Sequence, residues 1–324
     1  MRSRRLAAGA VLTLAAFALS GCTVLNTLGS AADEARMSSA LDDLEAELKM
    51  IPGITSVDAD MPIRGDLKFD VSVIARSEGL SADSQRAAVD AVTVVLTSAP
   101  FSEQPQAKFA LSDGEDETER TLVEIEFAGI DPAVVDAQLD YRDAFAIALG
   151  VPAGLWISPP QPDIGLDEYN RGITALDTPD DVDWAAIRGI PDDFDGARSW
   201  GIGAFVATGE LIPENLEAFA DEVVASEDYA FWDGPRDYLT VGVGSEKQAD
   251  DFESLPAWSR LLDLLDLAQS SGAAVDSATA SVGIGASAYF GECDDVRVEG
   301  IAEEFAAALN REGFDAKPGM CMLS

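Results

Sequence analysis

The stretch Leu67-Lys68-Phe69-Asp70-Val71-Ser72-Val73 alternates apolar and polar residues without interruption. Because successive side chains of a strand point to opposite faces, this pattern predicts a half-buried β-strand. Upstream, Leu41, Leu44 and Leu48 recur at a spacing of three and four residues before the turn Pro52-Gly53. That periodicity predicts a helix over 38–50, and a short strand is expected at 54–60. The start of the chain therefore favours a fold in which helices and half-buried strands are mixed.

Similar patterns continue to residue 158. Ser81 is the expected N-cap of a helix whose apolar stripe ends at Leu96. A hairpin is expected next, from strands 106–112 and 121–128 with an acidic turn between them. Asp131-Pro132 and Gly150 are typical first and last residues of a third helix. A short strand over 153–158 completes the pattern.

The second half has the same order of elements. Helices are expected to begin at Pro213 and Pro256 and to span 296–312, and strands are expected at 229–232, 238–243, 274–290 and through Cys321. Both halves then follow the order α-β-β-α-β-β-α-β. We predict an α+β fold of two related domains, each with helices packed on one face of a mainly antiparallel sheet. The expected divisions are a signal peptide (1–21), a lipidated tether (22–36), domain one (37–158), an acidic connector that contains prolines (159–200) and domain two (201–324).

The N-terminus has the features of an export signal. Three arginines (Arg2, Arg4 and Arg5) precede an apolar run from Leu6 to Leu19, which at about 14 residues is shorter than the ~20 that span a bilayer. The next residues complete Leu19-Ser20-Gly21-Cys22, which resembles the lipobox of bacterial lipoproteins. The resemblance covers residues 1–22. It implies that a peptidase recognises Leu19, Ser20 and Gly21, that Cys22 carries a lipid, and that the mature chain is held on the outer face of the cell membrane.

The alternative to a lipobox is that residues 1–22 form an uncleaved hydrophobic anchor. For export, a general secretory route is favoured over the twin-arginine route, because Ala7 and Ala8 replace the bulky apolar pair of the twin-arginine signal. The element order of 38–112, with its Pro52-Gly53 turn, also loosely resembles the BON-type modules of envelope lipoproteins.

The charge balance narrows the classes of partner. Without residues 1–21 the chain holds 18 basic and 59 acidic residues, a formal charge of −41. That excess excludes a nucleic-acid footprint and disfavours a fold lying flat on anionic lipid. A solvated, soluble surface is the simplest interpretation, and a positively charged partner or loosely held divalent cations are alternatives. The preference for arginine over lysine is typical of a bacterium with a GC-rich genome, such as an actinobacterium.

Histidine is absent from the whole chain. This excludes Ser-His-Asp and Cys-His catalysis and zinc sites of the His-Glu-x-x-His type. Ser-x-x-Lys and Walker-type glycine motifs are also missing, and Asp192-Asp193-Phe194-Asp195-Gly196 matches only part of a calcium loop. We therefore expect no enzyme activity, cofactor or metal site. A carboxylate-based wall hydrolase is the least favoured alternative, because 59 acids offer too many candidate pairs to be informative.

If Cys22 is lipidated, Cys293 and Cys321 are the remaining cysteines. One intrachain disulfide between them is predicted, since an exported chain permits it. The expected function is a non-enzymatic interaction or scaffolding module of the cell envelope, with an unknown envelope protein or ligand as its partner. The alternative is ligand capture in a cleft between the two domains, lined by Trp156, Trp184 and Trp200.

Overall fold

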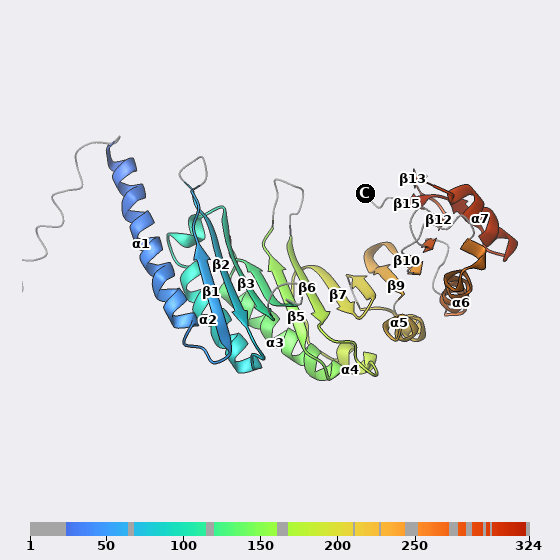
Figure 1. Ribbon diagram of the computed structural model, residues 1–324, viewed down its shortest axis with the longest axis horizontal. Coiled ribbons are helices and arrows are strands. Elements are labelled where there is room, and N and C mark those ends of the chain that lie inside the picture. Colours follow the sequence, from blue (N-terminus) through green and yellow to red (C-terminus); the bar gives the residue numbers. More distant parts are fainter. Residues whose placement is uncertain are drawn as a thin grey trace, which may run out of the picture.

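The computed structural model describes residues 24–63, 68–114, 120–160, 168–209, 211–226, 228–243, 252–271, 278–282, 287–293, 296–298 and 300–321. These residues form an α+β fold around one 13-stranded sheet. The order of strands in the sheet is the order of strands in the chain. Figure 1 shows the consequence: the elements lie side by side in sequence order, from α1 (Val24–Leu48) at one end to α7 at the other.

The sheet is built from a repeated ββα unit. Each unit contains an antiparallel strand pair followed by a helix, and the first strand of the next unit pairs in parallel with the second strand of the unit before it. The units are β1 (Ile54–Asp60), β2 (Asp70–Ser77), α2 (Ala82–Leu96); β3 (Gln106–Asp113), β4 (Arg120–Glu126), α3 (Pro132–Leu149); β5 (Ala153–Ser158), β6 (Tyr169–Ala175), α4 (Trp184–Arg188); β7 (Gly196–Ile202), β8 (Phe205–Thr208), α5 (Glu217–Val224); β9 (Tyr229–Asp233), β10 (Tyr238–Val243), α6 (Pro256–Ser270); and β11 (Ala278–Val282), β12 (Ser287–Phe290), α7 (Ala302–Arg311).

The last unit ends differently. After α7, β14 (Ala316–Pro318) pairs antiparallel with β12, and β13 (Val296–Arg297) pairs with β15 (Met320–Cys321) in a separate small sheet. At the other end α1 packs its second half on the first unit, with Met37, Leu41, Leu44 and Leu48 buried. The array therefore has a helix at its start and a closing strand at its end.

Local signals set the ends of several elements as the sequence predicts. The Ser81 hydroxyl accepts a hydrogen bond from the backbone N–H of Ser84 and starts α2. Asp131 caps α3 in the same way, and Gly150 ends it with a φ of 70°, a left-handed conformation that glycine adopts without a steric penalty. β1 and β5 have the predicted bounds. β2 begins at Asp70; Leu67, part of the acidic turn (residues 115–119) and residues 274–277 lie outside the described residues.

One apolar row crosses the helix-covered face of the sheet. Its members face one another across successive strands and are buried: Val57, Ala75, Leu111, Val123, Leu155, Ile173, Trp200, Ala207, Trp232 and Leu239. Because this row passes through residues 159–200 without a break, the core is continuous there. The predicted arrangement of two domains and a connector is not confirmed: β6, α4 and β7 extend the sheet where a linker was expected.

Two smaller expectations need correction, and a third becomes more detailed. Most strand pairs of the sheet are antiparallel as predicted, but parallel pairs join each unit to the next, so the sheet is mixed. The expected tether is helical from Val24 onward, and the last helix begins at Ala302 because Val296 and Arg297 pair with the chain end.

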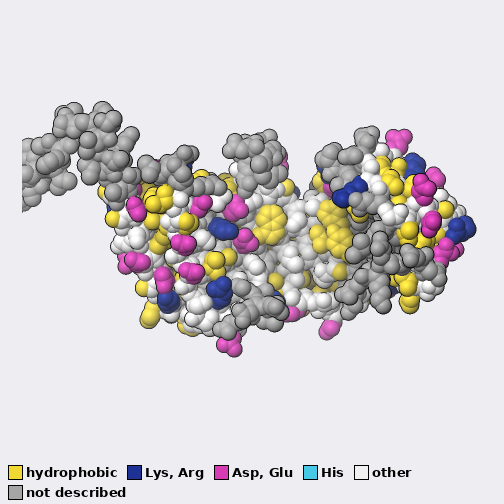
Figure 2. All heavy atoms as spheres, turned by 45° about the horizontal axis from the view of Figure 1, so that its top comes forward, with side chains coloured by type: hydrophobic (Ala, Val, Ile, Leu, Met, Phe, Trp, Pro, Cys, Tyr) yellow, Lys and Arg dark blue, Asp and Glu magenta, His cyan; other side chains and the backbone are white. Residues whose placement is uncertain are grey.

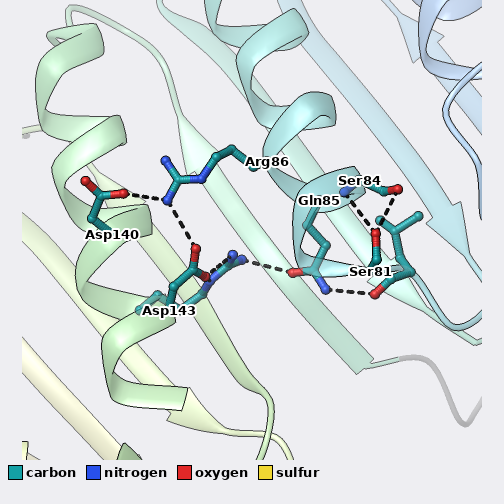
Figure 3. A network of polar contacts seen from close by, with 8 residues as sticks. Ser81, Ser84, Gln85, Arg86, Asp140 and Asp143 are labelled. Carbon is teal, nitrogen blue, oxygen red and sulfur yellow. Dashed lines mark hydrogen bonds and ion pairs between the residues drawn. The ribbon is translucent and has the colours of Figure 1, made fainter. Parts of the chain in front are cut away.

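Arginine–carboxylate pairs join neighbouring units. Figure 3 shows one such link, in which Arg86 of α2 lies 2.6 Å from Asp140 and 3.1 Å from Asp143 of α3. In the same network Arg142, which is buried, donates to Gln85 of α2 at 3.0 Å. Corresponding pairs between later units are Arg188–Glu217, Arg260–Glu222, Arg260–Asp228 and Arg311–Glu253. The acidic chain thus places arginines where adjacent units meet.

Candidate functional site

The face of the sheet opposite the helices changes character along the array. In the first two units it carries charges on Asp58, Asp60, Lys108, Glu124 and Glu126, whose positions follow from the strand register. From β5 onward the outward residues are almost all uncharged. The boundary lies between Glu124 of β4 and Trp156 of β5, which are directly opposite each other.

We call the uncharged part the neutral strip, and it consists of two adjacent rows that cross β5 to β10. The first row is Trp156, Gly172, Ser199, Thr208, Asp233 and Tyr238, and the second is Gly154, Thr174, Gly201, Val206, Phe231 and Thr240. Asp233 is the one charged residue of these rows. It is buried, accepts a hydrogen bond from Thr208 at 3.3 Å and pairs with Arg236 at 3.1 Å. Figure 2 shows charged side chains towards both ends of the molecule and a central region of hydrophobic and uncharged groups.

Trp156 is the exposed aromatic residue at the start of the strip. It retains 39% of its accessible surface, although Leu155 and Ile157 on either side of it are buried. The indole covers Gly172: a Cβ placed on that glycine would lie 1.7 Å from Nε1 and 2.3 Å from Cε2 of Trp156. Glycine is therefore required at position 172, because any side chain would displace the ring.

A cleft of about 920 Å³ lies where β6 and β7 begin and β8 and β9 end. Trp156, Leu211, Pro213, Trp232 and Pro235 supply most of its apolar lining. Its polar lining includes Asn170, Ser199, Thr208, Glu168, Arg171 and Arg198. The cleft is therefore continuous with the neutral strip, since Trp156, Ser199 and Thr208 belong to both.

The two arginines in the cleft wall are already paired. Arg171 is fully buried and donates to Asp192 through Nη1 at 3.0 Å and through Nη2 at 2.8 Å, and Gln138 of α3 accepts a further bond at 2.5 Å. Arg198 Nε lies 3.1 Å from the same Asp192 carboxylate. The guanidinium of Arg171 also lies over Tyr141 at 4.5 Å, with Phe194 and Trp200 close by.

Two titratable groups in this cluster, Asp192 and Tyr141, have shifted pKa values. Burial alone would raise the pKa of Asp192, but the hydrogen bonds and positive charge of Arg171 outweigh it and lower that pKa below its ordinary value. Burial raises the pKa of the Tyr141 phenol well above its ordinary range. The wall of the cleft is thus a cluster of two arginines around one carboxylate, in which the Nε atoms of Arg171 and Arg198 make no hydrogen bond to the described residues.

The structure separates the three tryptophans that the sequence grouped together. Trp156 lines the cleft. Trp184 is buried and donates to Asp221 at 2.7 Å, and Trp200 is buried against Tyr141 and Phe145. The cleft lies at the ends of four neighbouring strands of one sheet and not between two domains. The sequence reasoning missed Trp232, because its inward position in β9 depends on strand pairing.

The remaining predicted site residues fall at the chain ends. Leu19, Ser20, Gly21 and Cys22 lie outside the described residues. The side chain of Cys321 does as well, so its disulfide with Cys293 stays a prediction. The backbone register is compatible with it, because Cys321 pairs with Val296, three residues after Cys293.

Other site chemistries find no support in the described part of the chain. No group of three or more acidic or cysteine side chains is placed there to hold a metal ion, and Asp192 of the acidic loop is bound to arginine instead. Glu168 is the single carboxylate residue in the lining of the large cleft. Among the described helices, none is both long and apolar enough to cross a bilayer.

Comparison with known proteins adds no identity: no family model, curated protein or solved structure matches this chain. The fold and the neutral strip with its cleft are therefore the features of this chain that bear on its function.

Proposed function

We propose that this chain is a membrane-anchored, extracytoplasmic lipoprotein that serves as a non-enzymatic interaction or scaffolding module of the cell envelope. The sequence Leu19-Ser20-Gly21-Cys22 supports the anchor, with lipid on Cys22. α1 begins at Val24, two residues after that cysteine, and its 25 residues correspond to about 37 Å of helix. Met37 and Leu41 hold its second half on the first unit, so the helix would connect the lipid directly to the array.

The neutral strip is the observation that carries the binding role. In a chain with a net charge of −38, a surface kept soluble by acids is expected almost everywhere. The strip instead combines aromatic side chains with Gly, Ser and Thr across neighbouring strands. Arrays of side-by-side units commonly use such an extended face for binding. We place the partner-binding surface on the neutral strip.

The proposal assigns no catalytic step to the cleft. Histidine is absent from the chain, and the carboxylates of Asp192 and Asp233 are each paired with an arginine. A carboxylate-based wall hydrolase needs two facing acids, one of which is free to take up and release a proton. No described pair in the cleft meets that requirement.

Ligand capture is a second candidate, which the cleft itself favours. Its volume of about 920 Å³ lies within the usual range of ligand sites, and it joins exposed aromatic surface to a few polar groups. This candidate keeps the anchor and the strip of the main proposal and differs in the size of the partner.

Capture from intact envelopes tests the binding role. The lipidated protein would be cross-linked in cells and purified in three forms: wild type, Ser199→Asp in the neutral strip, and Ser72→Asp on the charged part of the same face. Both serines are half-buried strand residues that lie on the open face. We expect wild type and Ser72→Asp to retain the same partner and Ser199→Asp to lose it. Equal capture by all three would reject the strip as the binding surface.

The anchor has its own test. The Cys22→Ser chain should lack an acyl group and remain uncut at that site, as intact mass and detergent partitioning would show. A wild-type mature chain without acyl mass would reject the anchor.

A further inference from the structure

We infer that the cleft and the neighbouring neutral strip bind an uncharged saccharide chain. This inference rests on the proposed binding function, because it names the chemical class of the partner for the same surface.

Trp156 provides a stacking platform. One side of its indole lies on the backbone at Gly172, and 39% of the residue stays exposed. A sugar ring has an apolar face of C–H groups that packs on an aromatic ring, while its edge carries hydroxyls. The flat face of the Trp156 indole, which is held over Gly172, therefore suits the apolar face of a sugar ring.

The groups beside the platform match a ring edge. Asn170, Ser199 and Thr208 line the cleft, and their amide and hydroxyl groups can both donate and accept hydrogen bonds. Sugar hydroxyls also do both. These partners lie on β6, β7 and β8, the strands that follow Trp156 in the sheet.

Charge disfavours ionic ligands. In the cleft, Arg171 and Arg198 share the carboxylate of Asp192, and Glu168 lines the same cleft, so two positive charges face two negative ones. In the strip, the carboxylate of Asp233 pairs with Arg236. The site is therefore suited to a ligand that is polar without net charge.

Strand pairing disfavours an extended peptide. Peptides that add a strand to a sheet require an unpaired edge. Each strand from β5 to β9 has a neighbour on both sides, so the surface offers no such edge. A ligand must instead lie across the strands and contact side chains.

The dimensions favour a chain over a single sugar. Trp156 lies on β5 and Phe231 on β9, four strand spacings apart. At about 4.8 Å per spacing, the strip between them spans about 19 Å. An oligosaccharide lying across the strands would contact an aromatic residue near each end and Gly, Ser and Thr between them.

Affinity electrophoresis of the full mature protein tests the inference. The gels would contain dextran, mannan or a soluble β-1,4-glucan as neutral polymers, and polygalacturonate as the anionic one. The variants are Trp156→Ala, Trp156→Phe and, as a control, Ile147→Ala, which changes an exposed residue of α3. Near-UV circular dichroism would verify that each variant is folded.

We expect at least one neutral polymer to retard wild type and Ile147→Ala equally. Trp156→Ala should weaken that retardation about tenfold or more, and Trp156→Phe should restore most of it, because a phenyl ring keeps a stacking face. No retardation by any neutral polymer, retardation by polygalacturonate alone, or equal retardation of wild type and Trp156→Ala would overturn the inference. If Ser199→Asp loses an envelope partner while no neutral polymer binds wild type, the saccharide inference fails and the proposed interaction module stands.

Discussion

Arg171 and Asp192 meet through two parallel hydrogen bonds, Nη1–Oδ1 at 3.0 Å and Nη2–Oδ2 at 2.8 Å. This pair connects β6 with the loop that precedes β7, in the segment that the sequence presents as a connector. Arg171 has no exposed surface, and Asp192 keeps 16% of its side-chain surface. The pair therefore forms part of the cleft wall and also links two neighbouring units.

Replacing one partner of the Arg171–Asp192 pair should lower the stability of the protein. Asp192→Asn would leave the Arg171 charge buried without its counter-ion, and we expect the free energy of unfolding to fall by roughly 3 kcal/mol. Urea denaturation measures this change. Asp193→Asn, at an exposed neighbouring carboxylate, is the matched control and should change stability by less than about 0.5 kcal/mol. Equal effects of the two substitutions would contradict the assignment.

The same pair predicts a pH dependence. Although burial opposes it, the interaction with Arg171 lowers the pKa of Asp192 in the folded state. A lowered pKa gives stability that is present above the unfolded value, near 3.9, and is lost as the pH falls through the folded value. The stability difference between wild type and Asp192→Asn should therefore be constant from pH 5 to pH 7 and shrink below about pH 3.9. A difference that stays constant down to pH 2.5 would be inconsistent with this pKa direction.

Gly172→Ala should move Trp156. The new methyl group would meet the indole at 1.7 Å, so the ring must leave its place on β6. We expect a shift in tryptophan fluorescence and greater quenching by acrylamide, with circular dichroism in the far ultraviolet unchanged. Gly79→Ala is not a matched control, because Gly79 has a positive φ of 63°; Ala110→Gly on the same open face is suitable. Unchanged fluorescence in Gly172→Ala would mean that the ring does not depend on this glycine.

Salt should stabilise the protein. Excess acid opposes compactness, and raising the salt concentration from 0.1 M to 1 M shortens the screening length from ~10 Å to ~3 Å. The inter-unit arginine pairs lose strength as well, but exposed pairs contribute at most about 1 kcal/mol each. We expect a higher melting temperature in about 0.5 M NaCl than in about 10 mM. A lower melting temperature at the higher salt concentration would show that the arginine–carboxylate pairs outweigh the repulsion between the excess acidic residues.

The predicted bridge between Cys293 and Cys321 closes a loop of 29 residues. A loop of that length corresponds to roughly 3.6 kcal/mol of stabilisation in the chain-entropy model. Cys321→Ser should therefore speed hydrogen exchange in β12, β14 and α7 more than in the first units. Thiol labelling of the unreduced, denatured chain provides the direct test, since two titratable thiols would show that the bridge is absent.

Local chemistry explains which elements could be predicted. The caps Asp131 and Gly150 act within one turn of α3, so the sequence alone places both ends of that helix. β6 was missed for the opposite reason. Its inward residues are Arg171, Ile173 and Ala175, and an arginine at a buried position disguises the alternation. Its charge is compensated by Asp192, 21 residues away, which only the folded chain brings near.

In the candidate site, too, some features follow from local sequence and others depend on strand pairing. Trp156 alternates with the buried residues Leu155 and Ile157, so its outward direction is readable from β5 alone. Trp200 lies between Ser199 and Gly201, and these neighbours do not indicate which face of the sheet it occupies. It faces the helices because of its pairing with Ile173 and Ala207. The neutral strip emerges only when six strands are placed in register. Parallel pairing joins two strands on either side of a helix, and the local pattern of a single strand does not reveal its register with the next unit.

The agreement between strand order and chain order has a consequence for how the protein is made. Each new ββα unit docks on the unit just completed, and no described strand waits for a partner from a distant part of the sequence. A chain that emerges N-terminus first can therefore gain its structure progressively, with α1 and the first unit serving as the template for the rest. The apolar strands of a completed unit do not have to wait for the C-terminal units before they are buried. This limits the time that they are exposed to neighbouring chains.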